Sequence, residues 1–269
     1  MPRKISVLIP CYNAEKYIGA AIESVLEQDY PNLELVVVDD GSTDGAASEI
    51  AKFKDPRIIS ITQENAGHCA AANAAYELSS GELIKFFDAD DVLMPDMLKI
   101  QAGRVENRVD AIAMGEWDRF YESPEDAEFP HRSTYIDAAP NDWLIADWIA
   151  ARPMTQCGMF LIPRPIIDQA GLWDVRLTLI DDFEFFTRVL LASKQVLFTP
   201  GAKLAYRSGI TGSISGRKSR EAIESQALAL ELGVSYLLAV DESPDARLAC
   251  ANLLQMFEYE HFPYHSDLR

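Results

Sequence analysis

The sequence has few basic residues and few cysteines, and each shortage narrows the range of functions. Only 24 lysines and arginines stand against 42 aspartates and glutamates, which gives a formal net charge of −18. This charge argues against a nucleic-acid-binding protein and against broad adhesion to anionic lipid, because both need basic surface. The four cysteines are far apart and form no Cys-x-x-Cys pair. We therefore expect no zinc site, and buried thiols in a reducing compartment.

Long apolar runs are also missing. No run approaches the roughly 20 residues that a membrane-spanning helix needs. The first run, Ile5 to Ile9, is stopped by Pro10 and is too short for the core of a signal peptide. The chain is 48% hydrophobic over 269 residues, enough for one large domain with or without a tail. We expect a soluble, cytoplasmic protein, with a peripheral position at the inner face of the membrane left open.

Short apolar stretches alternate with amphipathic ones in the first hundred residues. The pattern predicts buried strands at 5–9, 33–38, 58–62 and 83–87, with helices at about 14–26, 45–53 and 66–78 between them. Such alternation is typical of a parallel sheet covered on both faces. The predicted fold class is therefore α/β, with a mostly parallel central sheet and helices on both sides.

Polar residues follow each of these four strands, where open parallel sheets bind ligands. The four segments are Pro10-Cys11-Tyr12-Asn13, Asp39-Asp40-Gly41-Ser42, Gln63-Glu64-Asn65-Ala66-Gly67 and Asp88-Ala89-Asp90-Asp91. No Gly-x-Gly-x-x-Gly turn follows the first strand and no P-loop is present, which disfavours the ordinary dinucleotide and P-loop sites. Crowded carboxylates repel one another, and Mg²⁺ or Mn²⁺ is the usual counter-charge. The alternative for the fourth segment is an acidic, solvated turn that caps the next helix.

In order and spacing, these segments resemble the signatures of family-2 glycosyltransferases of GT-A fold, over roughly residues 4 to 215. The resemblance implies that Tyr12 stacks on a nucleotide base and that Asp40, with Asp39 beside it, bonds the base or the ribose. It further implies that Asp88 faces the ribose and that Asp90, with Asp88, binds the metal that bridges the diphosphate. The other nucleotide-binding residues implied are Pro10, Asn13, Asn65, Gly67 and Ala89. Two alternatives stay open: Tyr12 as a core or rim aromatic, and Asp39 as a brace for the turn at Gly41-Ser42.

Two later segments resemble the same family. Asp181-Asp182 corresponds to its Glu-Asp pair, with Asp181 in place of the usual Glu, and this implies that Asp182 is the catalytic base. The alternative is that both acids cap a helix N-terminus. The segment from Tyr206-Arg207 to Ser213-Ile214-Ser215 resembles the loop that closes over the donor diphosphate, which implicates Arg207 and Ser213. A flexible surface loop is the alternative reading of that segment.

The middle of the chain, 116–139, is acidic and aperiodic, and we expect an irregular excursion that shapes the acceptor pocket. Aromatic residues in and near it could stack on sugar rings or fill a core: Trp117, Tyr121, Trp143 and Trp148. His131 is expected at the surface. Beyond 217 the pattern predicts two helices packed on the parent domain. The predicted organisation is a nucleotide-sugar half (1–115), an acceptor and catalytic half of the same domain (116–216), and a helical extension (217–269).

The sequence therefore favours a metal-dependent, inverting glycosyltransferase of polysaccharide biosynthesis, with Asp182 as general base and Mn²⁺ or Mg²⁺ as cofactor. The expected partners are a nucleotide diphosphate sugar, with UDP favoured, and a saccharide or lipid-linked acceptor. One alternative is a phosphohydrolase of the haloacid-dehalogenase type with Asp88 as nucleophile, although its nucleophile strand normally comes first in the chain and here comes fourth. The other is a catalytically silent module that binds sugar nucleotides or glycans. The oligomeric state is left open.

Overall fold

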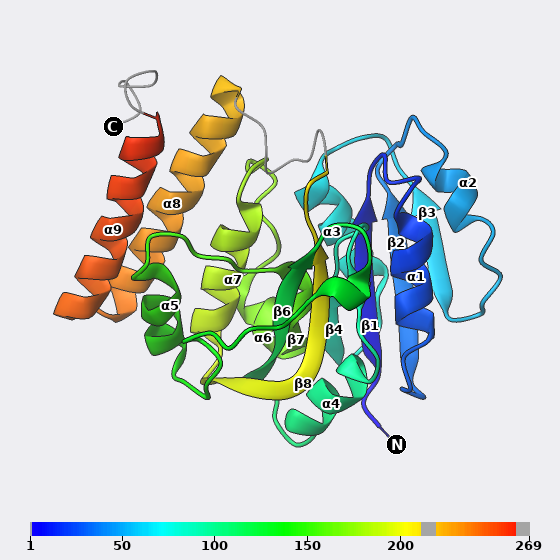
Figure 1. The fold of residues 1–269 in the computed structure, drawn as a ribbon, viewed down its shortest axis with the longest axis horizontal. Helices are drawn as coiled ribbons and strands as arrows, with labels where there is room; N and C mark the ends of the chain where they lie inside the picture. The colour runs from blue at the N-terminus through cyan, green and yellow to red at the C-terminus, as the bar shows by residue number, and fades with distance from the viewer. Residues whose placement is uncertain (1, 211–218, 262–269) are drawn as a thin grey trace.

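The computed structural model describes residues 2–210 and 219–261, and these form an eight-stranded sheet with helices on both sides (Figure 1). The strand order is β3-β2-β1-β4-β7-β6-β8-β5. The strands are β1 (Ile5–Cys11), β2 (Leu33–Asp39), β3 (Ile58–Thr62), β4 (Leu83–Phe86), β5 (Val92–Leu93), β6 (Ala111–Phe120), β7 (Phe160–Pro163) and β8 (Gln195–Arg207).

Nine α-helices lie within the described residues. They are α1 (Ile18–Leu26), α2 (Ala46–Ile50), α3 (His68–Leu78), α4 (Met97–Arg104), α5 (Pro140–Trp148), α6 (Arg164–Ala170), α7 (Asp181–Ala192), α8 (Arg220–Val240) and α9 (Pro244–His261). Two single turns of 3₁₀ helix lie at Pro124–Asp126 and Cys157–Met159.

The N-terminal half of the sheet has the predicted parallel arrangement. Strands β1, β2 and β4 are buried along their whole length, as expected of apolar strands with helices on both faces. In the register of β1 and β2, Cys11 lies opposite Asp39, so both strands end at the same level. Strand β3 pairs with β2 at the edge of the sheet and is largely exposed. The segments that follow β1, β2, β3 and β4 therefore emerge at one edge.

The C-terminal half of the sheet is mixed. Strand β7 runs antiparallel to both β4 and β6, while β6 and β8 are parallel to each other. The expectation of an irregular excursion from residue 116 was wrong for its first part, because β6 continues to Phe120 with Trp117 and Phe120 buried. This strand crosses the predicted boundary between residues 115 and 116. Strand β8 is a single long strand that ends at Arg207.

The expected helical C-terminal region is present, at the end of the molecule opposite β3 (Figure 1). Helix α8 packs along α7, and Gly233 of α8 lies so close to Phe183 that a Cβ at position 233 would come within 2.4 Å of the ring. The same helix reaches the turn before α7, where the hydroxyl of Ser225 accepts hydrogen bonds from the N–H groups of Thr178 and Leu179 at 2.8 and 3.1 Å. The C-terminal region therefore supports the start of α7.

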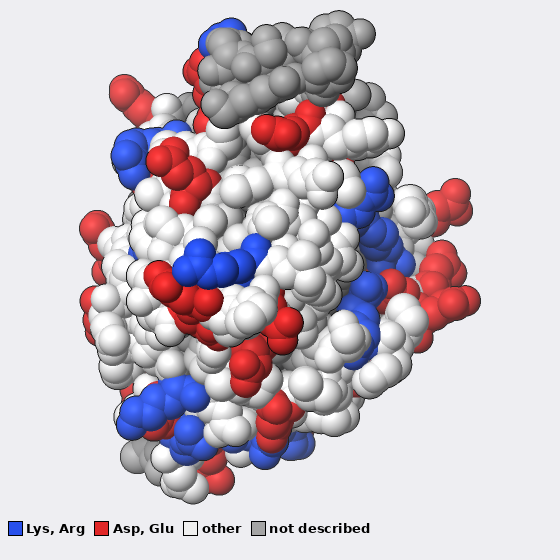
Figure 2. All heavy atoms as spheres, turned by 90° about the vertical axis from the view of Figure 1, so that its left-hand side faces the viewer, with Lys and Arg blue, Asp and Glu red and all other residues white. Residues whose placement is uncertain are grey.

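Helix α8 is long and apolar enough to cross a membrane by length and composition alone, with a mean hydropathy of 1.3 in its most apolar window. The sequence analysis found no such segment. A third of that window is buried in the protein, and core helices of soluble proteins meet the same criteria, so this is weak evidence for a membrane span. Figure 2 shows the face at this end of the molecule, where uncharged side chains are interspersed with basic and acidic ones.

Candidate active site

The loops after β1 and β2 are joined by reciprocal hydrogen bonds. Asn13 has φ 52°, a left-handed conformation that asparagine tolerates well. Its backbone N–H donates to the hydroxyl of Ser42 at 2.9 Å, and its side-chain oxygen accepts from the N–H of Thr43 at 2.7 Å. Asn13 therefore acts as a brace between the two loops. Beside it, Tyr12 is 45% exposed, which leaves its ring free to stack on a planar ligand.

Asp39 and Asp40 are both buried, but their carboxylates have different surroundings. Both oxygens of Asp40 accept hydrogen bonds from the loop after β3: Oδ1 from the side chain of Gln63 and the N–H of Ala66, and Oδ2 from the N–H of Gly67 at 2.8 Å. The side chain of Asn65 donates to Asp40 as well. Asp40 thus organises the β3–α3 loop.

Asp39 keeps one oxygen unused. Its Oδ1 accepts the N–H of Ser42 at 3.2 Å, which is the turn-bracing role considered in the sequence analysis. Its Oδ2 is buried and has no hydrogen-bond partner within the described part of the chain. Leaving a buried acceptor unpaired is costly, and such atoms commonly mark ligand sites. Of the two acids, only Asp39 has an oxygen without a hydrogen-bond partner among the described residues.

The turn after β4 holds three carboxylates in a small volume. Burial raises the pKa of Asp88, and burial together with the charge of Asp88 raises the pKa of Asp90 to about 7. Asp91 is fully buried, and its Oδ1 accepts the N–H of Arg207 at 2.8 Å while its Oδ2 has no partner in the described structure. Asp91 therefore fixes the end of β8 to this turn.

The carboxylates of Asp88 and Asp90 fit a divalent cation. Among the described residues only His68 approaches either of them as an ion-pair partner, with Nε2 4.0 Å from Asp88 Oδ1. The side chain of Arg207 binds the backbone of the turn instead, since its Nε donates to the carbonyl of Asp90 at 2.8 Å. Oxygen ligands with unbalanced negative charge are the kind that Mg²⁺ and Mn²⁺ take.

Arg207 lies in a cationic recess next to this turn. Its guanidinium packs over the rings of Tyr17 and Phe120, 4.8 and 4.4 Å from their centroids. A cavity of about 280 Å³ adjoins it, with a second cation, Lys16, in its wall. The cavity is lined by Lys16, Tyr17, Tyr121, Arg207, Ser208, Gly209 and Ile210. Residues 211–215 of the predicted closing loop, which include Ser213, lie outside the described residues.

The acid pair stands at the N-terminus of α7. Asp181 Oδ2 accepts from Nδ1 of His68 at 2.6 Å and from the thiol of Cys69 at 3.1 Å, and its Oδ1 accepts the N–H of Asp182 at 3.1 Å. Asp182 uses Oδ1 to accept the N–H of Phe183 at 2.8 Å, and no described residue hydrogen-bonds its Oδ2. One acid of the pair is fully engaged, and the other has a free oxygen.

The pKa values of the two acids differ because only Asp181 is paired with His68. Burial, then the charge of Asp181, raises the pKa of Asp182 to about 7, the range that suits a general base at neutral pH. Burial alone would raise the pKa of Asp181, but the charge and hydrogen bond of His68 bring it below its usual value. Burial would lower the pKa of His68, yet the charge of Asp181 and the hydrogen bond to it raise that pKa to about 9.

His68 is the residue that sequence reasoning missed. It is the first residue of α3, directly after Gly67, and it lies between Asp181 and Asp88. The only signal was its place next to the Asn65-Ala66-Gly67 motif. His68, Cys69 and Asp181 each place one possible metal-ligand atom within 4.8 Å of the others. Burial and Asp181 raise the pKa of the Cys69 thiol, however, so this group favours hydrogen bonding over metal binding.

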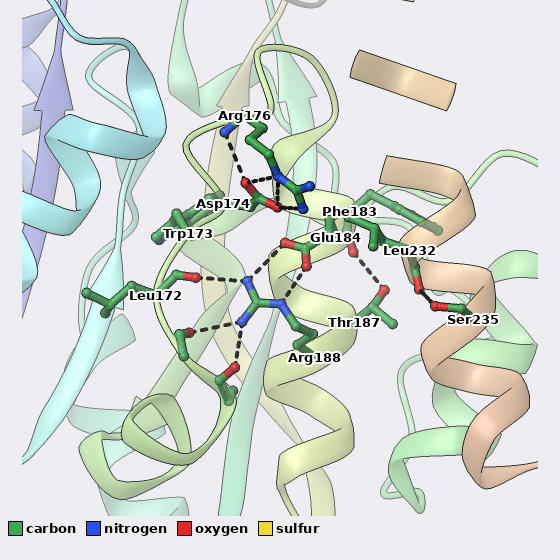
Figure 3. A network of polar contacts seen from close by, with 12 residues as sticks. Leu172, Trp173, Asp174, Arg176, Phe183, Glu184, Thr187, Arg188, Leu232 and Ser235 are labelled. Carbon is green, nitrogen blue, oxygen red and sulfur yellow. Dashed lines mark hydrogen bonds and ion pairs between the residues drawn. The ribbon is translucent and has the colours of Figure 1, made fainter. Parts of the chain in front are cut away.

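A second network holds the segment that leads into α7 (Figure 3). Arg188 pairs through two nitrogens with the buried carboxylate of Glu184 and donates to three backbone carbonyls at 2.6–3.1 Å. These carbonyls belong to Ala170, Gly171 and Leu172. The next residue, Trp173, stacks on Phe185 with ring centroids 4.0 Å apart. The segment before the acid pair is thereby attached to the helix that carries the pair.

The aromatic residues considered for the acceptor pocket divide into two groups. Trp117, Trp143 and Trp148 are almost fully buried, so they fill the core and offer no stacking face. Tyr121 is 66% exposed and lines the cavity beside Arg207. His131 is exposed, as expected. A second cavity, of about 590 Å³, lies between α5 and the α8–α9 junction and includes none of the predicted site residues.

Comparison with known proteins identifies the family of this chain. The model of glycosyl transferase family 2 matches residues 6–168, which is more than half of the chain. The chain belongs to this family. The family assignment drawn from the motifs is confirmed, and it rules against the phosphohydrolase alternative.

Several curated relatives are glycosyltransferases. The Escherichia coli UDP-Glc:alpha-D-GlcNAc-diphosphoundecaprenol beta-1,3-glucosyltransferase WfaP is 27% identical over 239 residues, 86% of this chain and 87% of WfaP. The E. coli enzyme WfgD, which is named for the same reaction, is 43% identical over 98 residues, 36% of this chain and 39% of WfgD. Glycosyltransferase GlyA of Streptococcus pneumoniae is 38% identical over 122 residues, 45% of this chain. The matched part is only 18% of GlyA.

Solved structures of the same fold confirm the predicted GT-A architecture. Staphylococcus aureus TarS in complex with UDP-GlcNAc superposes with a TM-score of 0.74 at 21% identity, covering 97% of this chain and 73% of the TarS chain. The mannosyltransferase PcManGT from Pyrobaculum calidifontis, in complex with GDP-Man and Mn²⁺, superposes with a TM-score of 0.63 at 19% identity. That superposition covers 98% of this chain and 71% of the PcManGT chain.

Proposed function

We propose that this protein transfers a sugar from a UDP-sugar to a hydroxyl group of a saccharide or lipid-linked acceptor, with inversion at the anomeric carbon. The observation that carries the proposal is the position of the Asp88–Asp91 turn next to the Asp181–Asp182 pair, with His68 between them. The turn would bind the metal and the donor diphosphate, and Asp182, whose pKa is raised, would lie beside them in a fold of family 2.

The donor nucleotide would lie over the ends of β1 and β2. Tyr12 would stack on the base, and the unpaired Asp39 Oδ2 would accept the imide N–H of uracil in a charge-assisted bond. This assigns base recognition to Asp39 and loop organisation to Asp40. Pro10, Asn13, Asn65, Gly67 and Ala89 would shape the same site. UDP is favoured because WfaP and WfgD are named as UDP-Glc-dependent enzymes and TarS was solved with UDP-GlcNAc.

Asp90, with Asp88, would hold Mn²⁺ or Mg²⁺ next to the donor diphosphate. A bound cation would neutralise charge on the departing diphosphate. Arg207 would add positive charge from the other side of the turn, together with Lys16 in the same cavity wall. Ser213 would assist from the segment that follows β8.

Asp182 would act as general base through its free Oδ2. It takes the proton from the acceptor hydroxyl while that oxygen forms a bond to the anomeric carbon. The bond from this carbon to the diphosphate oxygen breaks on the opposite side and releases UDP. General base catalysis of this kind contributes about 10²–10⁴ in rate. One displacement with one base gives inversion.

The acceptor is proposed to carry a lipid diphosphate, like the alpha-D-GlcNAc-diphosphoundecaprenol in the names of WfaP and WfgD. Such a substrate would place the enzyme in polysaccharide biosynthesis, in the cytoplasm or peripherally at the inner face of the membrane. In this proposal the donor binds mainly to residues 1–115. The acceptor binds to residues 116–216, and residues 217–269 support α7.

Thermal unfolding with nucleotides tests the donor site. UDP, GDP, dTDP, CDP and ADP are each added with Mn²⁺ or with EDTA. A nucleotide at 100 times its Kd stabilises by about 2.7 kcal/mol, a shift of about 5 °C for a chain of this size. We expect this shift with UDP and its loss in EDTA. No shift with any nucleotide would contradict the proposal.

Turnover separates an enzyme from a silent binding module. We expect release of UDP from UDP-Glc when a GlcNAc-diphospholipid is added, and a fall of about 10²–10⁴ in kcat for Asp182→Asn with UDP binding unchanged. An Asp182→Asn variant with most of the wild-type rate would refute the base assignment. UDP binding without turnover on any lipid-linked or free saccharide would favour the silent module.

A further inference from the structure

His68 joins the two halves of the active site. It follows Gly67, whose N–H is bound to Asp40, so its backbone belongs to the loop that Asp40 organises. Its Nδ1 donates to Asp181 Oδ2 at 2.6 Å, and its Nε2 lies 4.0 Å from Asp88 Oδ1. The edge of its ring packs on Trp173 with centroids 5.2 Å apart, so the ring is fixed as well as hydrogen-bonded. A single imidazole thus spans the donor side and the acid pair.

The turn before α7 needs such support. Ile180, directly before the acid pair, has φ 48° and ψ 34°. This left-handed conformation is unfavourable for a β-branched residue by about 1–2 kcal/mol. It is kept only where surrounding contacts hold it. The side chains of His68 and Cys69, both from α3, supply such contacts through Asp181.

Asp181 passes this constraint on to Asp182. Its Oδ1 accepts the N–H of Asp182 at 3.1 Å while its Oδ2 accepts from α3. Both oxygens of the Asp181 carboxylate are therefore engaged within the protein. This arrangement suits Asp181 to holding its neighbour in place. One hydrogen bond joins Asp40 to Gly67, the peptide bond joins Gly67 to His68, and two further hydrogen bonds connect His68 through Asp181 to the backbone of Asp182.

We propose that His68 is a positioning residue that sets the Asp182 carboxylate against the donor site through its Nδ1–Asp181 hydrogen bond. The inference rests on the proposed function, and it gives Asp181 a supporting role. The bond needs only an Nδ1–H, which both the imidazolium and one neutral tautomer carry. The effect of His68 should therefore appear in kcat, where the geometry of Asp182 matters, and not in the binding of the donor.

A matched pair of substitutions separates the two ends of the imidazole. In His68→Asn the amide nitrogen lies near the position of Nδ1 and can still donate to Asp181. In His68→Gln the amide lies near the position of Nε2 and faces Asp88 instead. We expect His68→Asn to keep kcat within about threefold of wild type. We expect His68→Gln and His68→Ala to lower kcat by about 10- to 100-fold, because a misplacement of about 1 Å has that effect. The KM for UDP-sugar should change by less than about threefold in all three.

Tyr76→Phe is the control on the same helix. It removes a hydrogen bond from α3 to another carboxylate, Asp168, that is 2.6 Å long and lies away from the acid pair. We expect its kcat to match that of the wild type. A double variant, His68→Ala with Asp181→Asn, should be no more than about threefold slower than the slower single variant, because both changes break the same bond.

The outcomes discriminate clearly. Equal losses in His68→Asn and His68→Gln, or a loss that appears in the donor KM instead of kcat, would overturn the proposal. If His68→Ala does not fold, the comparison of the Asn and Gln variants decides alone. Failure of the proposed function would appear earlier and differently, as wild-type protein that neither binds UDP nor turns over a UDP-sugar.

Discussion

Replacing Arg188 with methionine should remove one of the strongest supports of the acid pair. The guanidinium is the partner of Glu184, whose side chain is only 1% exposed, and it also satisfies three backbone carbonyls (Figure 3). Methionine fills much of the same volume but leaves a buried charge and three acceptors unpaired. Breaking one side of a buried ion pair lowers the free energy of unfolding by about 3–5 kcal/mol. At about 2 °C per kcal/mol in a chain of this length, the melting temperature should fall by about 6–10 °C.

The ion pair of Arg176 with Asp174 provides the comparison within the same network (Figure 3). The Arg176 side chain is 63% exposed, so Arg176→Met should lower the free energy of unfolding by less than about 1 kcal/mol. Urea unfolding monitored by circular dichroism measures both variants. A second test is Arg188→Met combined with Glu184→Gln, which leaves no buried charge and should recover part of the loss. Equal effects of Arg188→Met and Arg176→Met would refute the reasoning.

Three further predictions follow from the electrostatics and packing. Burial and the charge of Asp181 raise the pKa of Asp182 to about 7, and a general base must be deprotonated to act. The kcat should therefore fall about tenfold per pH unit below pH 7 and level off above it. A flat profile between pH 5 and 8 would exclude Asp182 as the base. Burial alone would raise the pKa of Glu34, but its hydrogen bonds bring it to about 2, so its contribution of at most about 3 kcal/mol is complete above pH 4.5 and is lost as the pH falls toward 2. Glu34→Gln should therefore remove this part of the acid-dependent loss in urea unfolding, and unchanged pH dependence would count against the assignment. Gly233→Ala places a Cβ 2.4 Å from the ring of Phe183, so the free energy of unfolding should fall by about 1–3 kcal/mol. In an unobstructed helix the same substitution would raise the free energy of unfolding. Differential scanning calorimetry shows which sign the change has.

The N-terminal half of the fold could be predicted closely from sequence. Strands β1, β2 and β4 are buried on both faces, so they appear as continuous apolar runs between turn residues. The exposed edge strand at 58–62 also has the predicted bounds. The alternation of apolar and amphipathic stretches alone predicted that the carboxyl ends of these strands meet at one edge of the sheet. Local pattern and tertiary structure agree here because each element is defined by its own residues.

The second half was harder because tertiary contacts determine its elements. Strand β6 continues through Glu116, Asp118 and Arg119, which look like loop residues, because Trp117 and Phe120 are buried between them. Helix α5 has no clear apolar period and was not predicted. The two C-terminal helices were predicted, and α8 packs on α7 while α9 packs on α5 and α8.

The site shows the same division between local and long-range information. The motifs located the residues correctly at one edge, but they did not distinguish the engaged carboxylate of Asp40 from the free oxygen of Asp39. They also gave no role to His68, because its partner Asp181 is 113 residues away in sequence. Hydrogen bonds over such separations leave no local pattern to read.

The antiparallel pairing of β4 with β7 has a consequence for synthesis of the chain on the ribosome. Strand β4 is complete at Phe86, but its second neighbour begins only at Phe160, so one edge of the nascent sheet stays unpaired while the intervening residues are made. At about 5–20 residues per second this takes several seconds. An open edge of buried-type strand is a template for association with other chains. Nascent chains stalled between β4 and β7 should therefore bind chaperones, and chains released after β8, which pairs with the outer edge of β6, should not.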